Sequence, residues 1–256
     1  MSFAAVAWPV PRAWASRQKN PITLPAAVVV GAAWIGLALF GHELHQGLSD
    51  EHHGPASFVS PVVRAAAWAL MIVAMMGPVV LSAVTFLRAN TLSWRRGRAT
   101  VQFLLVYVLM WMTVAVPAWM LEAEVNRVDS PYRPVVAAGA LLVAAGWQTT
   151  GLKHLALDDC HRPHTLPPRG WRAMKGVGSF AVRHAWACIR TCAPLMLAVA
   201  VAAASIPAAH LPIMAAAAGG MVFERRSRHP RKAARMVAIA LVITATACLL
   251  LAGGSD

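Results

Sequence analysis

Long apolar runs alternate with short polar segments along most of the chain. Seven of these runs approach the roughly 20 apolar residues, at about 1.5 Å of rise each, that a membrane-spanning helix needs. They cover residues 22–40, 65–87, 100–120, 134–152, 184–204, 208–223 and 236–251. The sixth run is short, so a hairpin or a re-entrant pair around residues 205–211 stays open. The pattern predicts an all-α, polytopic transmembrane helix bundle of about seven spans.

Composition supports a membrane environment. Hydrophobic residues make up 58% of the chain and charged residues 13%, against roughly 25% charged in a typical soluble domain. A charged group at the centre of a spanning helix costs about 2.5–3.5 kcal/mol on insertion scales, which explains why the charges cluster in short segments. The net charge of +13 does not indicate nucleic-acid binding, because the basic residues lie in loops between apolar runs. The lipid bilayer is therefore the expected partner, and protein partners stay undetermined.

The distribution of basic residues predicts the orientation. With the N-terminus in the cytoplasm, nineteen of the 23 Lys and Arg residues fall on the inner side, as the positive-inside rule requires. An odd number of spans then places the C-terminus outside. We expect residues 1–21 to form a cytoplasmic N-terminal segment and residues 22–252 a single transmembrane helical domain. The expected location is the inner (plasma) membrane of a bacterial-type cell, as a multi-pass protein.

Signals for secretion or catalysis are absent from the sequence. The first twenty residues lack a continuous apolar core, so we expect no cleavable signal peptide. No paired carboxylates, Ser–His arrangement or zinc-protease motif falls within a span, which indicates that the protein is not an enzyme. The four cysteines are too few for a disulfide scaffold in so apolar a chain.

Soft metal ligands recur at helical spacing in the fifth run. Four candidate ligands follow one another at intervals of four residues: His184, Cys188, Cys192 and Met196. Residues at this spacing share one face of a helix, and thiolate and thioether groups favour Cu(I), while thiolate with imidazole also suits zinc. A single ion can bridge neighbours on this face, but not all four. The alternative interpretation is that these side chains only pack against other helices.

Two further groups of candidate ligands lie in predicted loops. Cys160, His161 and His164 fall in the inner loop after the fourth run and are close enough in sequence to share one ion. His42 and His45 begin a histidine-rich outer segment that holds four of the ten histidines within twelve residues; such tracts bind zinc or divalent copper, or simply titrate near neutral pH. Polar loops without a metal are the alternative for both groups.

Three sequence patches resemble a family known as domain of unknown function 2182, which groups predicted metal-binding integral membrane proteins. The first patch runs from Trp68 through a methionine-rich helix to Pro78. The second runs from Gly146-Trp-Gln through Lys153 to Cys160-His-Arg-Pro. The third is Cys188-Ile-Arg-Thr-Cys-Ala-Pro-Leu-Met. The patches share order and spacing with the family, and the resemblance covers most of the chain from about Trp68 to Arg235.

The chain also departs from this family pattern. Ala156 replaces the first cysteine of the second patch, Thr191 replaces one of the paired cysteines in the third, and Arg190 replaces a glycine there. About half of the thiols that the resemblance implies are therefore present.

Together, the residues and the resemblance predict a membrane protein that binds copper, or second zinc, and holds or relays the ion at the cytoplasmic side. The Cys160 group and the pair Cys188 and Cys192 would meet if the fifth span packs against the loop. A structural or assembly subunit without a metal, and a transporter of ions or small solutes, are the alternatives.

Overall fold

The computed structural model describes residues 23–49, 61–160, 166–167, 169–206 and 209–253. Over these residues the chain forms helices and no strands. Two short 3₁₀ helices, Ser93–Arg95 and Ser130–Tyr132, precede α3 and α4. The α-helices are α1 Thr23–Ser49, α2 Pro61–Ala89, α3 Arg96–Arg127, α4 Arg133–Gln148, α5 Gly151–Cys160, α6 Gly170–Ser205, α7 His210–Arg226 and α8 Pro230–Gly253. The predicted all-α class is confirmed.

Several helices are long and apolar enough to cross a membrane. Among the described residues four meet this condition: Pro61–Ala89, Ser93–Arg127, Gly170–Ser205 and Pro230–Leu250. A fifth span arises if α4 and α5, bent by 67° at their junction, cross as a pair, and Leu24–Leu39 is a shorter apolar helix. A multi-pass membrane bundle is therefore supported, while the count of seven spans and the N-in, C-out orientation stay predictions.

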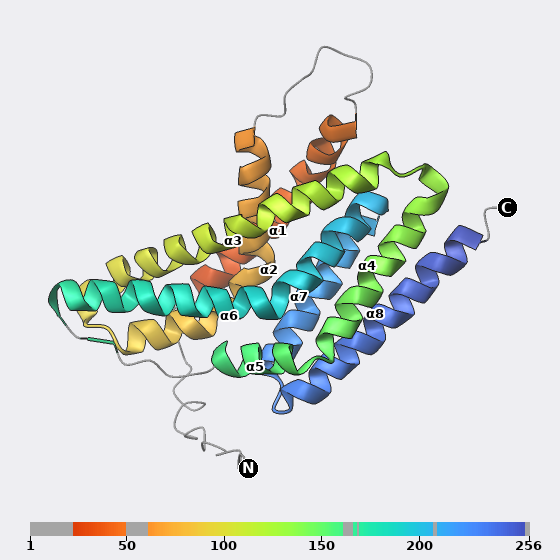
Figure 1. The fold of residues 1–256 in the computed structure, drawn as a ribbon. Helices are drawn as coiled ribbons and strands as arrows, with labels where there is room; N and C mark the ends of the chain where they lie inside the picture. The colour runs from red at the N-terminus through yellow and green to blue at the C-terminus, as the bar shows by residue number, and fades with distance from the viewer. Residues whose placement is uncertain (1–22, 50–60, 161–165, 168, 207–208, 254–256) are drawn as a thin grey trace, which may run out of the picture.

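Helix α6 lies at the centre of the bundle. It contacts α3, α4, α5 and α7, and Figure 1 shows it running beside α3. In its most apolar window 78% of the residues are buried, against 28% for α3 and for α8. Its buried second half is rich in alanine and continues through Pro194, and small residues let neighbouring backbones approach closely in lipid. A side chain on α6 is therefore placed to meet groups from several helices.

The other helices pack on α6 or on its neighbours. Helix α2 lies between α1 and α3, α4 pairs with α8, and α7 contacts α2, α6 and α8 (Figure 1). The indole Nε1 of Trp68 donates a hydrogen bond to the Trp111 carbonyl at 3.3 Å, which ties α2 to α3. At one end of the same pair Arg64 lies 3.6 Å from the Glu122 carboxylate.

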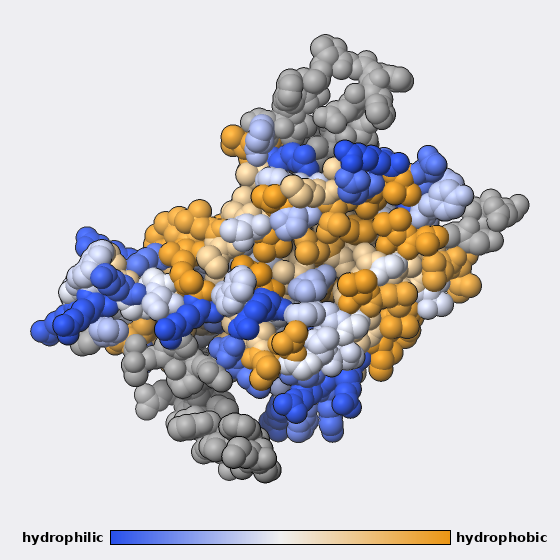
Figure 2. Space-filling model, in the orientation of Figure 1, coloured by the Kyte–Doolittle hydropathy of each residue, from blue (hydrophilic) through white to orange (hydrophobic). Residues whose placement is uncertain are grey.

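The outer surface is apolar over the middle of the molecule. Figure 2 shows a broad orange area bounded by blue surface, including the turn between α7 and α8. Exposed large side chains on this surface include Leu105 and Leu109 of α3 and Ile239 and Ile243 of α8, each more than half exposed. Soluble monomers rarely expose apolar patches larger than a few hundred Å², so this surface fits contact with lipid.

The structure corrects three local predictions. The segment expected to be an inner loop after the fourth span is helix α5, which packs against α6. The fifth span starts at Gly170, not near residue 184, because Ala173, Val177 and Phe180 continue one buried helical face while intervening basic side chains stay exposed. The fourth run, predicted as one span over 134–152, breaks after Gln148 and bends by 67° into α5, while the hairpin or re-entrant alternative at 205–211, between α6 and α7, stays open.

Candidate metal centre

The ladder of soft ligands on α6 faces the interior of the bundle. His184, Cys188, Cys192 and Met196 are each no more than 5% exposed. They belong to the same helical face that packs against α3, as the ring contacts of His184 show. Its imidazole lies 5.9 Å from the Phe103 ring and 6.2 Å from the Tyr107 ring, between centroids. These four side chains therefore point away from lipid, into a dry region of the protein.

Cys188 is the centre of a group of polar contacts. The Tyr107 hydroxyl of α3 lies 3.1 Å from the Cys188 Sγ, and both side chains are buried. The Cys192 thiol lies one turn further along the same face of α6 and interacts electrostatically with the Cys188 thiol. All the cysteines are free thiols. Two neighbouring thiols are thus held on one helix face with a hydroxyl against the first of them.

Helix α5 brings a third thiol to this place. The Cys160 Sγ lies 3.9 Å from the hydroxyl of Thr191, which sits between the other two cysteines on α6. Cys160 also interacts electrostatically with Cys188. We name Cys160, Cys188 and Cys192 the thiol cluster. The sequence hypothesis required Cys160 and Cys188 to meet; the packing of α5 on α6 places Cys160 beside Thr191, and a shared metal site for the thiols stays a prediction.

Arg225 of α7 faces the thiol cluster. Its guanidinium interacts electrostatically with all three thiols and with the Tyr107 hydroxyl. Its Nε and Nη2 atoms are buried without a hydrogen-bond partner, and it makes no ion pair with a carboxylate, among the described residues. A guanidinium stays protonated, so a positive charge with unused donors points at the thiols.

Two ion pairs hold α5 against its neighbours. Lys153 lies 2.7 Å from the Glu224 carboxylate of α7, and the two side chains are 1% and 3% exposed. Asp159 lies 2.8 Å from the Arg190 guanidinium of α6, with both partners partly exposed. Both α5 partners precede Cys160 in this short helix, Lys153 by seven residues and Asp159 by one. They fix the position of its thiol next to α6.

Among the described residues, none of the remaining predicted ligands lies in the thiol cluster. His161 and His164 lie outside the described residues. His42 and His45 fall within helix α1, but their side chains also lie outside the described part of the structure. Met196 is buried one turn beyond Cys192. Among the described residues, no three His, Cys, Asp or Glu side chains converge as a group able to hold a metal ion.

Sequence reasoning missed Tyr107, Arg225 and the Lys153–Glu224 pair. Tyr107 is one of only two tyrosines in the chain and lies within an apolar run, which was a usable signal. Arg225 was counted with the basic residues of a loop, where most such residues mark the cytoplasmic side. Only the fold shows that α7 extends to this residue and turns it toward the thiols.

Comparison with known proteins supplies the family. No curated protein and no solved structure matches this chain. Residues 65–248 match the PpoB2 family, which is described as a copper chaperone. The resemblance found in the sequence is thus supported as far as a copper-related family, although not under the name domain of unknown function 2182. The matched range includes all of the thiol cluster, Tyr107 and Arg225 and covers well over half of the chain. The chain therefore belongs to the PpoB2 copper chaperone family.

Proposed function

We propose that this protein binds Cu(I) at the thiol cluster and holds or relays the ion within the inner membrane, without catalysing a reaction. The observation that supports the proposal is the buried pair Cys188 and Cys192 on one face of α6, with the Arg225 guanidinium of α7 and the Cys160 thiol of α5 interacting with it electrostatically. Thiolates are the form of cysteine that binds metal, and soft sulfur ligands select Cu(I). The copper ion is the cargo in this proposal.

The charges at the cluster favour a monovalent ion. Two thiols that lose their protons carry two negative charges, and one Cu(I) leaves a complex with a single negative charge. The positive charge of Arg225 then makes the group neutral, which matters because an isolated charge in a low-dielectric region is costly. The Lys153–Glu224 pair is already neutral. Cys188 and Cys192, which lie within reach of each other, are the primary pair, with Cys160 beside them.

The ligand number also separates copper from zinc. A structural zinc site takes four ligands in a tetrahedron, and the described residues hold no such group. Cu(I) accepts lower coordination numbers, so a pair or trio of thiolates is sufficient. This argument favours copper over zinc, the second candidate from the sequence. Burial of the thiols on facing helices also favours a metal site over the structural subunit.

A cysteine control makes the proposal testable. Cys248 of α8 is 6% exposed and packs with Ala138 and Leu141, in a separate apolar cluster. The purified protein, a variant with all three cluster cysteines changed to serine, and Cys248→Ser are titrated with Cu(I) under anaerobic conditions against a coloured Cu(I) chelator. Helix content and elution volume are recorded for each, to compare folded samples only.

The wild type and Cys248→Ser are expected to withdraw a stoichiometric amount of Cu(I) from the chelator, and the triple variant to withdraw none. Equal Cu(I) binding by the triple variant would refute the assignment of the cluster. Arg225→Met is expected to weaken Cu(I) binding by at least about tenfold, which corresponds to about 1.4 kcal/mol, while Arg225→Lys keeps the charge and most of the affinity. Equal affinity of the Met and Lys variants would contradict the charge argument.

A further inference from the structure

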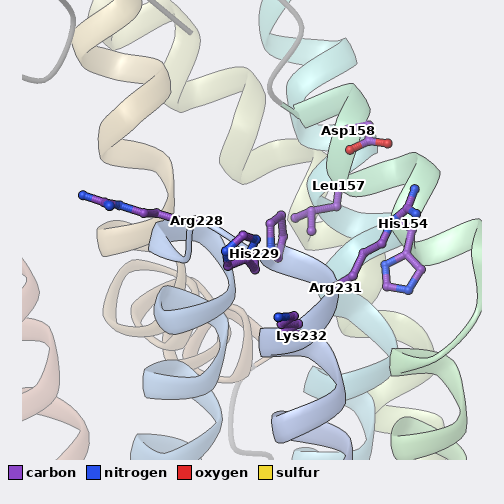
Figure 3. A pocket seen from close by; sticks show the side chains of 8 residues that line it. His154, Leu157, Asp158, Arg228, His229, Arg231 and Lys232 are labelled. Atoms are coloured by element: carbon purple, nitrogen blue, oxygen red, sulfur yellow. The ribbon is translucent and has the colours of Figure 1, made fainter. Parts of the chain in front are cut away.

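A cavity of about 280 Å³ lies where α5 meets the turn between α7 and α8. Figure 3 shows the side chains that line it: His154, Leu157, Asp158, Arg228, His229, Pro230, Arg231 and Lys232. The volume is near the lower end of the roughly 300–1,000 Å³ typical of small-molecule sites. Nothing in the proposed copper function uses these residues.

The lining is strongly basic. Arg228, Arg231 and Lys232 are permanently charged, two histidines add further nitrogen atoms, and Asp158 is the one carboxylate of the lining. The Arg231 side chain extends toward His154 (Figure 3), with which it interacts electrostatically. The buried Nδ1 of His154 has no hydrogen-bond partner among the described residues. Guanidinium groups bind phosphate oxygens through paired hydrogen bonds, so the cavity suits a phosphate-bearing anion.

The turn that carries the basic side chains is held in shape by its own hydrogen bonds. The His229 amide donates to the Ser227 hydroxyl at 3.2 Å. The amides of Lys232 and Ala233 donate to the His229 carbonyl at 3.0 and 3.1 Å. The cavity is therefore preformed, and a ligand does not need to order it.

Apolar surface begins immediately beside the cavity. Lys232, Met236, Ile239 and Ile243 lie on one face of α8, and the last three are 59%, 60% and 65% exposed. On α5, Leu155, which follows His154, is also exposed, at 62%. A molecule with a phosphate in the cavity and long apolar chains would lay those chains along these exposed side chains. An anionic phospholipid has this combination, and a free phosphate does not.

We propose that this basic cavity binds the phosphate headgroup of an anionic phospholipid, whose acyl chains lie along α8 and α5. Basic pockets between membrane helices on the cytoplasmic side are suited to such headgroups. The lipid would join α5, which carries Cys160, to the α7–α8 turn. The proposal concerns residues outside the thiol cluster, so it does not depend on copper binding.

The test uses the full-length protein in detergent with lipid added back. The variant Arg231→Gln with Lys232→Gln removes two charges from the cavity. The matched control, Arg98→Gln with Arg172→Gln, removes two exposed charges from α3 and α6 outside the lining. Binding of phosphatidylglycerol and of phosphatidylcholine is measured by native mass spectrometry, with and without inorganic phosphate as a competitor. Cu(I) titration of each sample records the thiol cluster separately.

The wild type and the control are expected to retain phosphatidylglycerol in preference to phosphatidylcholine. The cavity variant is expected to lose about 30-fold in affinity, since each of the two basic residues near an anionic lipid contributes about fivefold. Equal loss in the cavity variant and the control would overturn the proposal, because general surface charge would then explain binding. Displacement of the lipid by millimolar inorganic phosphate would also overturn it and identify free phosphate as the occupant. If the cavity variant loses lipid binding but retains Cu(I) binding, the loss of lipid is not caused by a failure of the copper site.

Discussion

The ion pair between Lys153 and Glu224 gives the sharpest stability prediction. Both side chains are almost fully buried, at 1% and 3% exposure, and the charged atoms are 2.7 Å apart. Lys153→Met removes the cation and leaves the Glu224 carboxylate buried without its ion-pair partner, with only the electrostatic interaction with Arg225 remaining. Removing one partner of a buried pair typically costs about 3–5 kcal/mol. The other Glu224 oxygen, Oε1, has no hydrogen-bond partner among the described residues, so no second donor is in place to offset that loss.

A double variant separates the effect of an unpaired buried charge from the effect of losing the ion pair. Changing both residues to Met removes both buried charges, and such replacements are often neutral or stabilising. We expect the double variant to recover most of the stability lost by Lys153→Met. A surface control is available on α3, where Arg127 pairs with Glu124 and the two side chains are 73% and 65% exposed. Arg127→Met should cost no more than about 1 kcal/mol.

The assay is reversible unfolding in mixed micelles, with the free energy of unfolding taken from far-UV circular dichroism. The wild type is expected to be the most stable, with Arg127→Met and the double variant close to it. Lys153→Met is expected to be well below all three. A loss from Lys153→Met that is no larger than the loss from Arg127→Met would refute the reasoning. It would mean that water or another group solvates Glu224 at its position between α5 and α7.

Two further predictions concern packing and the thiols. Tyr107→Phe removes the hydroxyl that lies against Cys188 but keeps the ring. Cu(I) affinity should fall by at least about tenfold, as expected for a hydrogen bond to a charged acceptor, with little change in helix content; unchanged affinity in the chelator assay would show that the hydroxyl does not contact the bound form. Gly77→Ala places a Cβ 2.6 Å from Cγ2 of Val30, so α1 and α2 must separate. The thermal midpoint should drop, with a loss of about 1–3 kcal/mol in the free energy of unfolding, whereas Gly139→Ala, whose Cβ meets nothing within 4 Å, should leave the midpoint unchanged.

The helices could be predicted from the sequence because the bilayer imposes length and apolarity on each span independently of its neighbours. The burial of the α6 ladder followed from the same spacing rule, since His184 and Cys188 lie one turn apart. The environment of Lys153 could not be predicted in this way. A lysine in a short polar segment normally faces water, and its burial depends on Glu224, 71 residues further along the chain.

The first residue of α6 also could not be predicted from hydropathy. Arg172, Lys175 and Arg183 interrupt the apolar run, so hydropathy ends the span near residue 184. The helix nevertheless begins at Gly170, because the charged side chains point outward while one face stays buried against other helices. Hydropathy averages over all faces of a helix, whereas packing acts on one.

Pro194 lies in α6 two residues after Cys192. Because proline has no amide hydrogen, the carbonyl of Arg190, four residues earlier, receives no helical hydrogen bond from it. That carbonyl belongs to the turn between Cys188 and Cys192. The turn can therefore open or tighten without breaking a backbone hydrogen bond at this position, and the sulfur-to-sulfur separation is adjustable where a regular helix would fix it. If the protein relays Cu(I) as proposed, it must both hold the ion and release it, and this proline would let the spacing of the two sulfur ligands change between those states.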